Sequence, residues 1–167
     1  TDSQVQYASV IRSSGNDLLT LLNDILDLAK VESGTVTMDM ASAALDHLCH
    51  NIQREGEPVA KAKGLLYTVD LASDCPETIT TDPDRLRQVL KNLLSNAFKF
   101  THAGEVRVKV GMATTGWSTS IESLVSAPSV VAFSVTDTGI GIEQTHQERI
   151  FDEFAQGDGT TARFYGG

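Results

Sequence analysis

Three polar side chains of one predicted helix have the types and spacing to bind a metal-bound phosphate. Asn92, Asn96 and Lys99 are four and three residues apart, which places them on one helix face. A carboxamide oxygen can ligate Mg²⁺ without adding charge, and a lysine one turn away can reach a phosphate oxygen. A solvated polar helix face would have the same spacing, so spacing alone does not separate the two interpretations.

A second candidate group follows an apolar strand. Asp137 ends that strand and leads directly into a turn in which Gly139 and Gly141 can take positive φ and let a ligand approach the backbone. The Asp137 carboxylate could accept a hydrogen bond from an exocyclic amine such as that of adenine. A β-turn with a capping aspartate is the alternative interpretation. We expect a buried acid here that shares one cleft with Asn96 and Lys99.

The end of the chain combines glycines with one basic side chain. Its glycines are Gly157, Gly159, Gly166 and Gly167. They give the segment the mobility expected of a lid over phosphates, and Arg163 could assist a phosphate. A frayed terminus and an ordinary surface arginine are the alternatives.

The helix that would position the polar triplet has a strong start signal. Asp82 supplies a capping carboxylate, Pro83 stands at the first helical position, and Asp84 lies near the positive end of the dipole. We expect this helix to run to about residue 100. Its expected core stripe is Leu86, Leu90, Leu93, Ala97 and Phe100.

Hydrophobic periodicity predicts an α+β layered domain after a separate helix. Residues 5–32 have helical and nearly heptad spacing, which indicates a long amphipathic helix suited to a hairpin or dimeric bundle. We place the domain boundary after Gly34, giving units 1–34 and 35–167. The other expected elements are strands at 36–40, 65–71, 105–112 and 130–137, a helix at 45–63 with Pro58 as a kink and Gly64 as C-cap, and a short helix around 143–149.

Composition and charge exclude several classes of protein. A content of 41% hydrophobic and 21% charged residues is that of a soluble globular protein. The net charge of -9 argues against a nonspecific nucleic-acid surface, so a polyanionic ligand must be held locally. No apolar run approaches the roughly 18 residues of a membrane span. We therefore expect a cytoplasmic chain without direct membrane contact, although the intact protein could be membrane-anchored. Cys49 and Cys75 share no motif, which favours two free thiols.

Together these motifs resemble the signature boxes of the histidine kinase family, whose ATP-binding domains belong with those of DNA gyrase, a heat-shock chaperone and the mismatch-repair ATPases. Residues 85–101 are similar to its N box, 137–142 (DTGIGI) to its G1 box, 150–156 (IFDEFAQ) to its F box and 159–167 to the approach to its G2 box. Residues 11–34 are similar to the second helix of its dimerisation hairpin. The resemblance implies a two-layer α/β sandwich of the Bergerat type preceded by that helix.

The same resemblance implies a site for ATP and Mg²⁺. Asn96 would hold Mg²⁺, Lys99 would contact a phosphate, and Asp137 would read the adenine amino group. Phe151 and Phe154 would anchor the lid, a role compatible with their being ordinary core aromatics. The other residues implied to bind ATP or shape its pocket are Asn92, Gly139, Gly141, Arg163, Gly166 and Gly167.

A kinase of this family would pass the γ-phosphoryl to a histidine and then to an aspartate in the receiver domain of a response regulator. Its partners would be its own or a partner subunit's dimerisation helices, and the intact protein would be a homodimer. None of His47, His50, His102 and His146 has the family's phosphoacceptor context. We therefore expect that histidine to lie outside this chain and the chain alone not to autophosphorylate. The G2 pattern is expected to continue past residue 167.

Two other classes remain as alternatives. An ATP-hydrolysing switch of the gyrase or chaperone type needs a glutamate on the asparagine-bearing helix, and residues 85–100 contain none. A nucleotide-free scaffold with a histidine kinase-like fold is the second alternative. The intact motif residues count against it.

Overall fold

A single long helix, α1 (Asp2–Glu32), makes up most of the first part of the chain. The computed structural model describes residues 2–35 and 37–147. Gly34 follows the helix in the left-handed conformation, with φ 65°, as its predicted end requires. Many apolar side chains along α1 are exposed, and the exposed fractions of Ile11, Leu18 and Ile25 are 60 to 72%. The predicted amphipathic helix is therefore confirmed. Within this unit, the apolar side chains named above are exposed to solvent.

The chain divides into two compact units, Thr1–Asp39 and Met40–Gly167. The boundary predicted after Gly34 falls five residues before this division. The assignment of a dimerisation role to the first unit and a catalytic role to the second stays a prediction. Among the described residues, no helix has the length and apolar character needed to cross a membrane.

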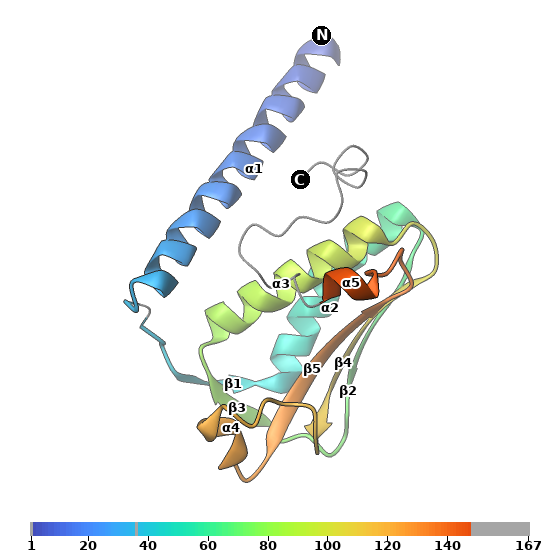
Figure 1. Cartoon of the computed structure of the whole chain (residues 1–167). Coiled ribbons are helices and arrows are strands. Elements are labelled where there is room, and N and C mark those ends of the chain that lie inside the picture. Colours follow the sequence, from blue (N-terminus) through green and yellow to red (C-terminus); the bar gives the residue numbers. More distant parts are fainter. Residues whose placement is uncertain (1, 36, 148–167) are drawn as a thin grey trace. The chain divides into compact units, whose positions relative to one another are not determined.

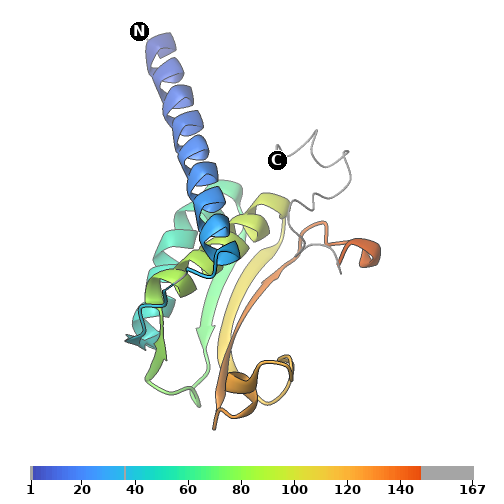
Figure 2. The same cartoon turned by 60° about the vertical axis from the view of Figure 1, so that its left-hand side comes forward.

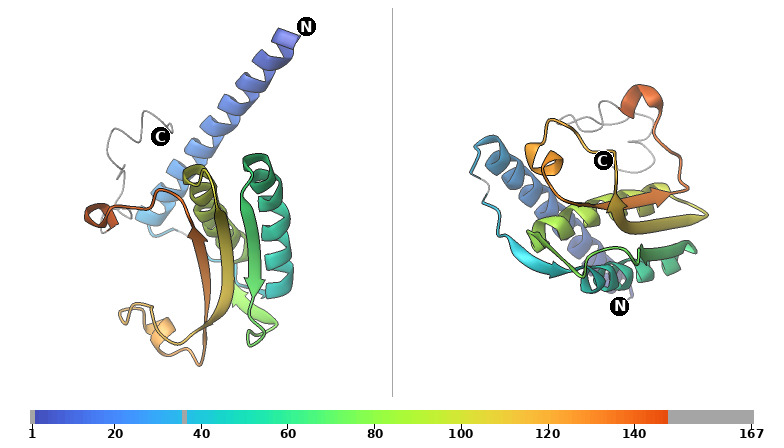
Figure 3. Two further views of the ribbon diagram at one scale, coloured as in Figure 1. Left: turned by 90° about the vertical axis from the view of Figure 1, so that its right-hand side faces the viewer. Right: turned by 90° about the horizontal axis from the view of Figure 1, so that it is seen from below.

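The second unit is built on a three-stranded sheet with the strand order β2-β4-β5. Strand β2 (Leu66–Leu71) runs parallel to β4 (Glu105–Ala113), and β4 runs antiparallel to β5 (Val130–Asp137). Helices α2 (Leu45–Lys63) and α3 (Pro83–Phe100) cover one face of this sheet (Figures 1 and 2). The edge-on view in Figure 3 shows the two layers, as the α+β prediction requires.

The core lies between these helices and the inward row of β4. Val106, Val108 and Val110 are wholly buried, with 0% exposure, because alternate residues of a strand face the same side. The Tyr67 ring meets the Phe98 ring edge-on, with centroids 5.3 Å apart. Its hydroxyl donates to the Ile52 carbonyl at 3.0 Å, and burial, with Glu55 and Cys49 nearby, raises the pKa of Tyr67 to about 12.

The predicted core stripe of α3 was partly wrong. Leu90 and Ala97 are buried as expected, whereas Leu93 is 43% exposed and Leu94 and Phe98 are buried instead. Both arcs of the helix are apolar, so its periodicity did not decide between them. The buried positions 90, 94, 97 and 98 follow helical spacing, and the contact of Phe98 with Tyr67 fixes that choice.

The strand predicted at residues 36–40 was also wrong. The first strand is β1 (Ala41–Ala44), which pairs antiparallel with β3 (Thr78–Thr81), a strand that the sequence did not reveal. These four-residue strands form a separate sheet, and their pairing rather than their local sequence stabilises them. Two short helices complete the described chain, α4 (Glu122–Val125) and α5 (Gln144–Gln147); the predicted helix around 143–149 extends past the described residues.

The other predicted elements are confirmed with small shifts at their ends. Helix α2 has the predicted bounds, and Gly64 caps it in the left-handed conformation with φ 68°. Its N–H faces the carbonyls of Ala60 and Lys61, as in common helix C-caps. Pro58 lies inside α2, but the predicted kink is not tested.

Candidate nucleotide-binding site

The start of α3 fixes the position of the candidate metal and phosphate residues along the helix. Asp82 is 6% exposed, and its Oδ1 accepts from the backbone N–H groups of Asp84 and Arg85 at 3.1 Å each. Pro83 occupies the first helical turn. This is the predicted N-cap, and it confirms the start of the helix.

The polar triplet lies on the outer part of α3. Asn92 and Asn96 are exposed, and Lys99 is partly buried with its Nζ 5.4 Å from the centroid of the Phe100 ring. Neither asparagine carboxamide has a hydrogen-bond partner among the described residues, so each can bind a ligand or water. The structure thus confirms their shared helix and leaves their roles as predictions.

The C-terminal end of α3 is held by a side chain of α2 and by its own C-cap. Lys63 Nζ donates to the Phe98 carbonyl, and the backbone N–H of Thr101 bonds to the Ala97 carbonyl at 3.1 Å. The side chain of Thr101 is wholly buried. The last turn of α3, which carries Lys99, is therefore anchored to the core of the unit.

Asp137 lies at the end of β5, beside this end of α3. Its Oδ1 accepts from the Gly139 N–H at 2.8 Å and from the Thr101 hydroxyl at 3.4 Å. Its Oδ2 has no hydrogen-bond partner in the described part of the chain. The expectation of a buried acid was wrong, because Asp137 is exposed.

Glycine is required at the two positions of this turn for different physical reasons. Gly141 has φ 68°, which favours glycine as predicted. Gly139 does not have positive φ; a Cβ there would lie 2.5 Å from the Phe100 carbonyl oxygen and 2.7 Å from Asp137 Oδ1. Close approach of the backbone, rather than an unusual dihedral angle, therefore requires glycine at position 139.

Hydrogen bonds join the turn after β5 to the segment that leaves α3. Thr138 N–H bonds to the Glu105 carbonyl at 3.1 Å, and the Glu105 N–H donates to the Thr138 hydroxyl at 2.9 Å. The Ile140 N–H bonds to the Phe100 carbonyl at 3.4 Å. This network places Asp137 at a fixed position relative to the helix that carries Asn96 and Lys99.

Sequence reasoning missed Thr101 and Thr138 as parts of this site. Thr101 lies four residues after Ala97 and so continues the buried face of α3, which is the signal that could have identified it. Thr138 gives no such signal, because its hydroxyl bonds only in the folded turn.

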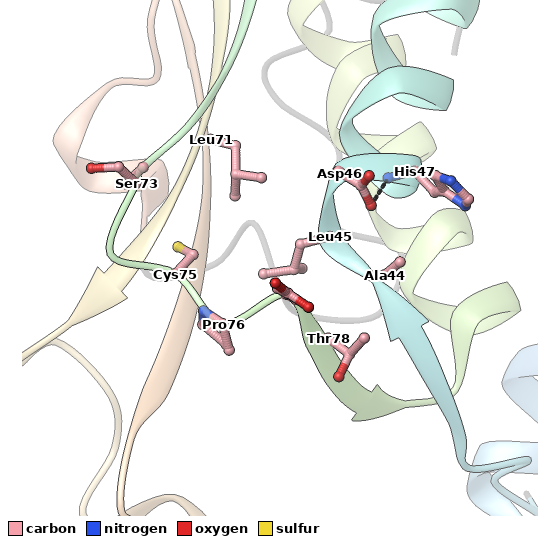
Figure 4. A pocket seen from close by; sticks show the side chains of 11 residues that line it. Ala44, Leu45, Asp46, His47, Leu71, Ser73, Cys75, Pro76 and Thr78 are labelled. Atoms are coloured by element: carbon pink, nitrogen blue, oxygen red, sulfur yellow. Dashed lines mark hydrogen bonds between the residues drawn. The ribbon is translucent and has the colours of Figure 1, made fainter.

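Several predicted site residues lie outside the described residues. They are Phe151, Phe154, Arg163, Gly166 and Gly167. A pocket of about 500 Å³ lies elsewhere, between the start of α2 and the segment joining β2 to β3, with Leu45, Leu71 and Cys75 in its lining (Figure 4). None of the predicted site residues lines it. A cavity that joins Asn96 to Asp137 stays a prediction.

Residues 81–167 match the family model of the histidine kinase-, DNA gyrase B- and HSP90-like ATPases, over slightly more than half of the chain. The chain belongs to this family. Within the family it is homologous to the ATP-binding catalytic domains of the sensor histidine kinases of two-component signalling.

Two curated relatives match almost the full chain. It is 37% identical over 166 residues to the autoinducer 2 sensor kinase/phosphatase LuxQ of Vibrio cholerae, covering 99% of this chain and 18% of LuxQ. It is 31% identical over 167 residues to the signal transduction histidine-protein kinase BarA of Escherichia coli, covering 100% of this chain and 17% of BarA. The chain thus spans less than a fifth of the length of these relatives.

A solved structure confirms the fold. Full-length ShkA in complex with AMPPNP matches with a TM-score of 0.75 and 33% sequence identity, over 97% of this chain and 32% of that one. The family match and this structural similarity establish the Bergerat fold that the sequence predicted.

Proposed function

We propose that this chain binds Mg-ATP and forms the catalytic part of a sensor histidine kinase. In the proposed reaction the γ-phosphoryl passes to a histidine on a dimerisation helix and then to an aspartate in the receiver domain of a response regulator. The observation that carries the proposal is the bonding of Asp137, next to the helix with the asparagines and the lysine. One carboxylate oxygen accepts from two donors, and the other has no hydrogen-bond partner among the described residues.

The chemistry of the donors fits an adenine nucleotide. An ionised carboxylate only accepts hydrogen bonds, so the second oxygen of Asp137 suits the exocyclic amine of adenine. Asn96 offers a neutral oxygen ligand for Mg²⁺, Lys99 a cation for a phosphate, and Asn92 a second carboxamide one turn earlier. Gly139 and Gly141 let the base approach the turn. Support for ATP also comes from AMPPNP in the ShkA structure.

The remaining predicted residues would act on the phosphates. Phe151 and Phe154 would anchor a lid, while Arg163, Gly166 and Gly167 would approach the phosphate groups. ATP supplies the phosphoryl group, and Mg²⁺ neutralises charge on it. The protein's contribution is to orient the nucleotide toward the histidine and to exclude water, because positioning accounts for much of the rate of such transfers.

We further propose that α1 packs against a dimerisation helix of its own or a partner subunit in a homodimer. Support comes from the exposed apolar side chains along α1, since a stripe of this width is normally buried against another helix. The nucleotide-binding unit would lie in the cytoplasm, where ATP and response regulators are present.

Calorimetric titration of the chain with Mg-AMPPNP tests nucleotide binding. We expect saturable binding and a rise in the free energy of unfolding of about 2.7 kcal/mol at a hundredfold excess over Kd. Absence of both heat and thermal shift would contradict the proposal and favour a nucleotide-free scaffold.

Transfer is tested on the full-length protein with γ-labelled ATP. Acid-labile, base-stable label on a histidine, followed by its loss to a response regulator, is the expected result. Steady release of inorganic phosphate without labelled protein would instead indicate an ATP-hydrolysing switch.

A further inference from the structure

A buried hydroxyl at the end of α3 has no role in the site as proposed so far. Thr101 is the C-cap residue of α3, and its exposure is 0%. A threonine can end a helix at the surface, where water satisfies the hydroxyl. Here the hydroxyl is buried away from water, so it needs a hydrogen-bond partner within the protein.

The hydrogen-bond partner of this hydroxyl is the Asp137 carboxylate. Within the described residues, the Thr101 Oγ1 contacts Asp137 Oδ1 at 3.4 Å and no other hydrogen-bond partner. Because an ionised carboxylate has no proton to give, Thr101 must donate.

The two donors make the carboxylate oxygens of Asp137 unequal. Oδ1 accepts from the Thr101 hydroxyl and the Gly139 N–H, whereas Oδ2 has no hydrogen-bond partner among the described residues and can accept from a ligand. A group that faces Oδ2 must therefore donate. The N6 amine of adenine can donate, while the O6 carbonyl of guanine would meet a like partial charge.

Thr101 also joins the two halves of the proposed site. Asn96 lies five residues earlier on the same chain segment, and the intervening turn is held at Phe98 and Phe100 by Lys63 and Ile140. A rotation of the Asp137 carboxylate relative to α3 would change the distance between the base and the metal ligand.

We propose that Thr101 is the positioning residue that fixes the Asp137 carboxylate and thereby sets the preference of this chain for adenine over guanine triphosphates. This inference rests on the proposed nucleotide-binding function. It assigns Thr101 no direct contact with nucleotide.

The test compares Thr101→Val, which keeps the shape and removes the hydroxyl, with Thr101→Ser, which keeps the hydroxyl. Affinities for AMPPNP and GMPPNP are measured with Mg²⁺ for both variants and the wild type. Thr68→Val is the matched control, because it removes a buried hydroxyl on β2 that has no hydrogen-bond partner among the described residues. Circular dichroism and thermal melts verify folding of each variant.

We expect Thr101→Val to bind AMPPNP about tenfold more weakly, as loss of a hydrogen bond to a charged group implies, with little change for GMPPNP. Thr101→Ser and Thr68→Val should resemble the wild type. Unchanged AMPPNP affinity in Thr101→Val would overturn the inference while leaving the proposed function intact. Equal losses for both nucleotides, or an unfolded Thr101→Val together with weak selectivity in Thr101→Ser, would show a purely structural role. Failure of the wild type to bind AMPPNP would refute the proposed function and this inference with it.

Discussion

At the scale of single residues, the arrangement around Asp137 shows how neighbours determine the chemistry of an exposed carboxylate. Exposed aspartates usually have both oxygens in water and no preferred orientation. Asp137 differs because Gly139 allows the backbone to turn back and donate to Oδ1 at 2.8 Å. An added Cβ at residue 139 would occupy that space. The orientation of the acid thus depends on the absence of a side chain two residues later.

Replacing Asp137 with Asn tests this orientation. The amide group has one oxygen and one NH₂, so it cannot both accept from Gly139 and Thr101 and reliably accept from an adenine amine. We expect Mg-AMPPNP to bind about 10- to 100-fold more weakly by calorimetry. Asp70→Asn is the matched control, since Asp70 is an exposed strand aspartate. Equal affinities of Asp137→Asn and the wild type would argue against a role in base recognition.

Thr68 offers a stability prediction at the same scale. Its Oγ1 is buried without a hydrogen-bond partner among the described residues, which costs free energy that a methyl group would not. Thr68→Val should raise the free energy of unfolding by about 1 kcal/mol in urea denaturation. Thr136→Val, across the sheet at an exposed position, should change it by less than about 0.5 kcal/mol. A destabilised Thr68→Val would mean that the hydroxyl has a partner after all.

At the scale of elements, α3 connects the core, the cap and the candidate site. One face packs Leu90, Leu94 and Phe98 into the core, while Asn92 and Asn96 lie exposed. Because a helix rotates 100° per residue, the spacing of these residues fixes the angle between the two faces, and packing of one face orients the other. The buried cap at Asp82 stabilises the first turn of the helix that carries the site residues.

Asp82→Ala should lower the free energy of unfolding by about 1 to 2 kcal/mol, because the N–H groups of Asp84 and Arg85 lose their acceptor. Asp82→Asn keeps a capping oxygen and should lose less. Chemical denaturation of both variants makes the comparison. If the Ala and Asn substitutions lowered the free energy of unfolding equally, the other contacts of Asp82 rather than the cap would explain the lost stability.

Much of this fold could be predicted from local sequence, and the exceptions share a cause. The cap at Asp82, the left-handed Gly64 and strands β4 and β5 follow from signals within a few residues. Strands β1 and β3 depend on pairing between segments more than thirty residues apart, which no local pattern encodes. Which arc of α3 is buried likewise depends on Tyr67, a residue of strand β2. In the site, the helix spacing and the glycine turn could be predicted, whereas the contact of Thr101 with Asp137 requires the fold.

At the scale of the whole molecule, the chain consists of two units with different sources of stability. The second unit has its own buried core, built from β4, α2 and α3. The first unit is a helix, and helices of this kind are stabilised mostly by tertiary packing of their apolar face. We therefore expect its stability in solution to depend on packing of this face, which the proposed dimer would supply.

Charge placed in the apolar stripe of α1 tests that dependence. Ile11 and Leu18 are seven residues apart and 72% and 68% exposed, so Glu at both positions would introduce charges into a helix interface without disturbing the core of the second unit. We expect light scattering after size exclusion to show a dimer for the wild type and a monomer for the double variant, with helix content reduced and AMPPNP affinity unchanged. Gln6→Glu, at an exposed position of the same helix outside both heptad positions of the stripe, should leave the dimer intact. A wild type that is monomeric at all concentrations, or a dimer equally sensitive to Gln6→Glu, would refute association through this stripe. Burial of the apolar side chains is the interaction that would hold the two helices together.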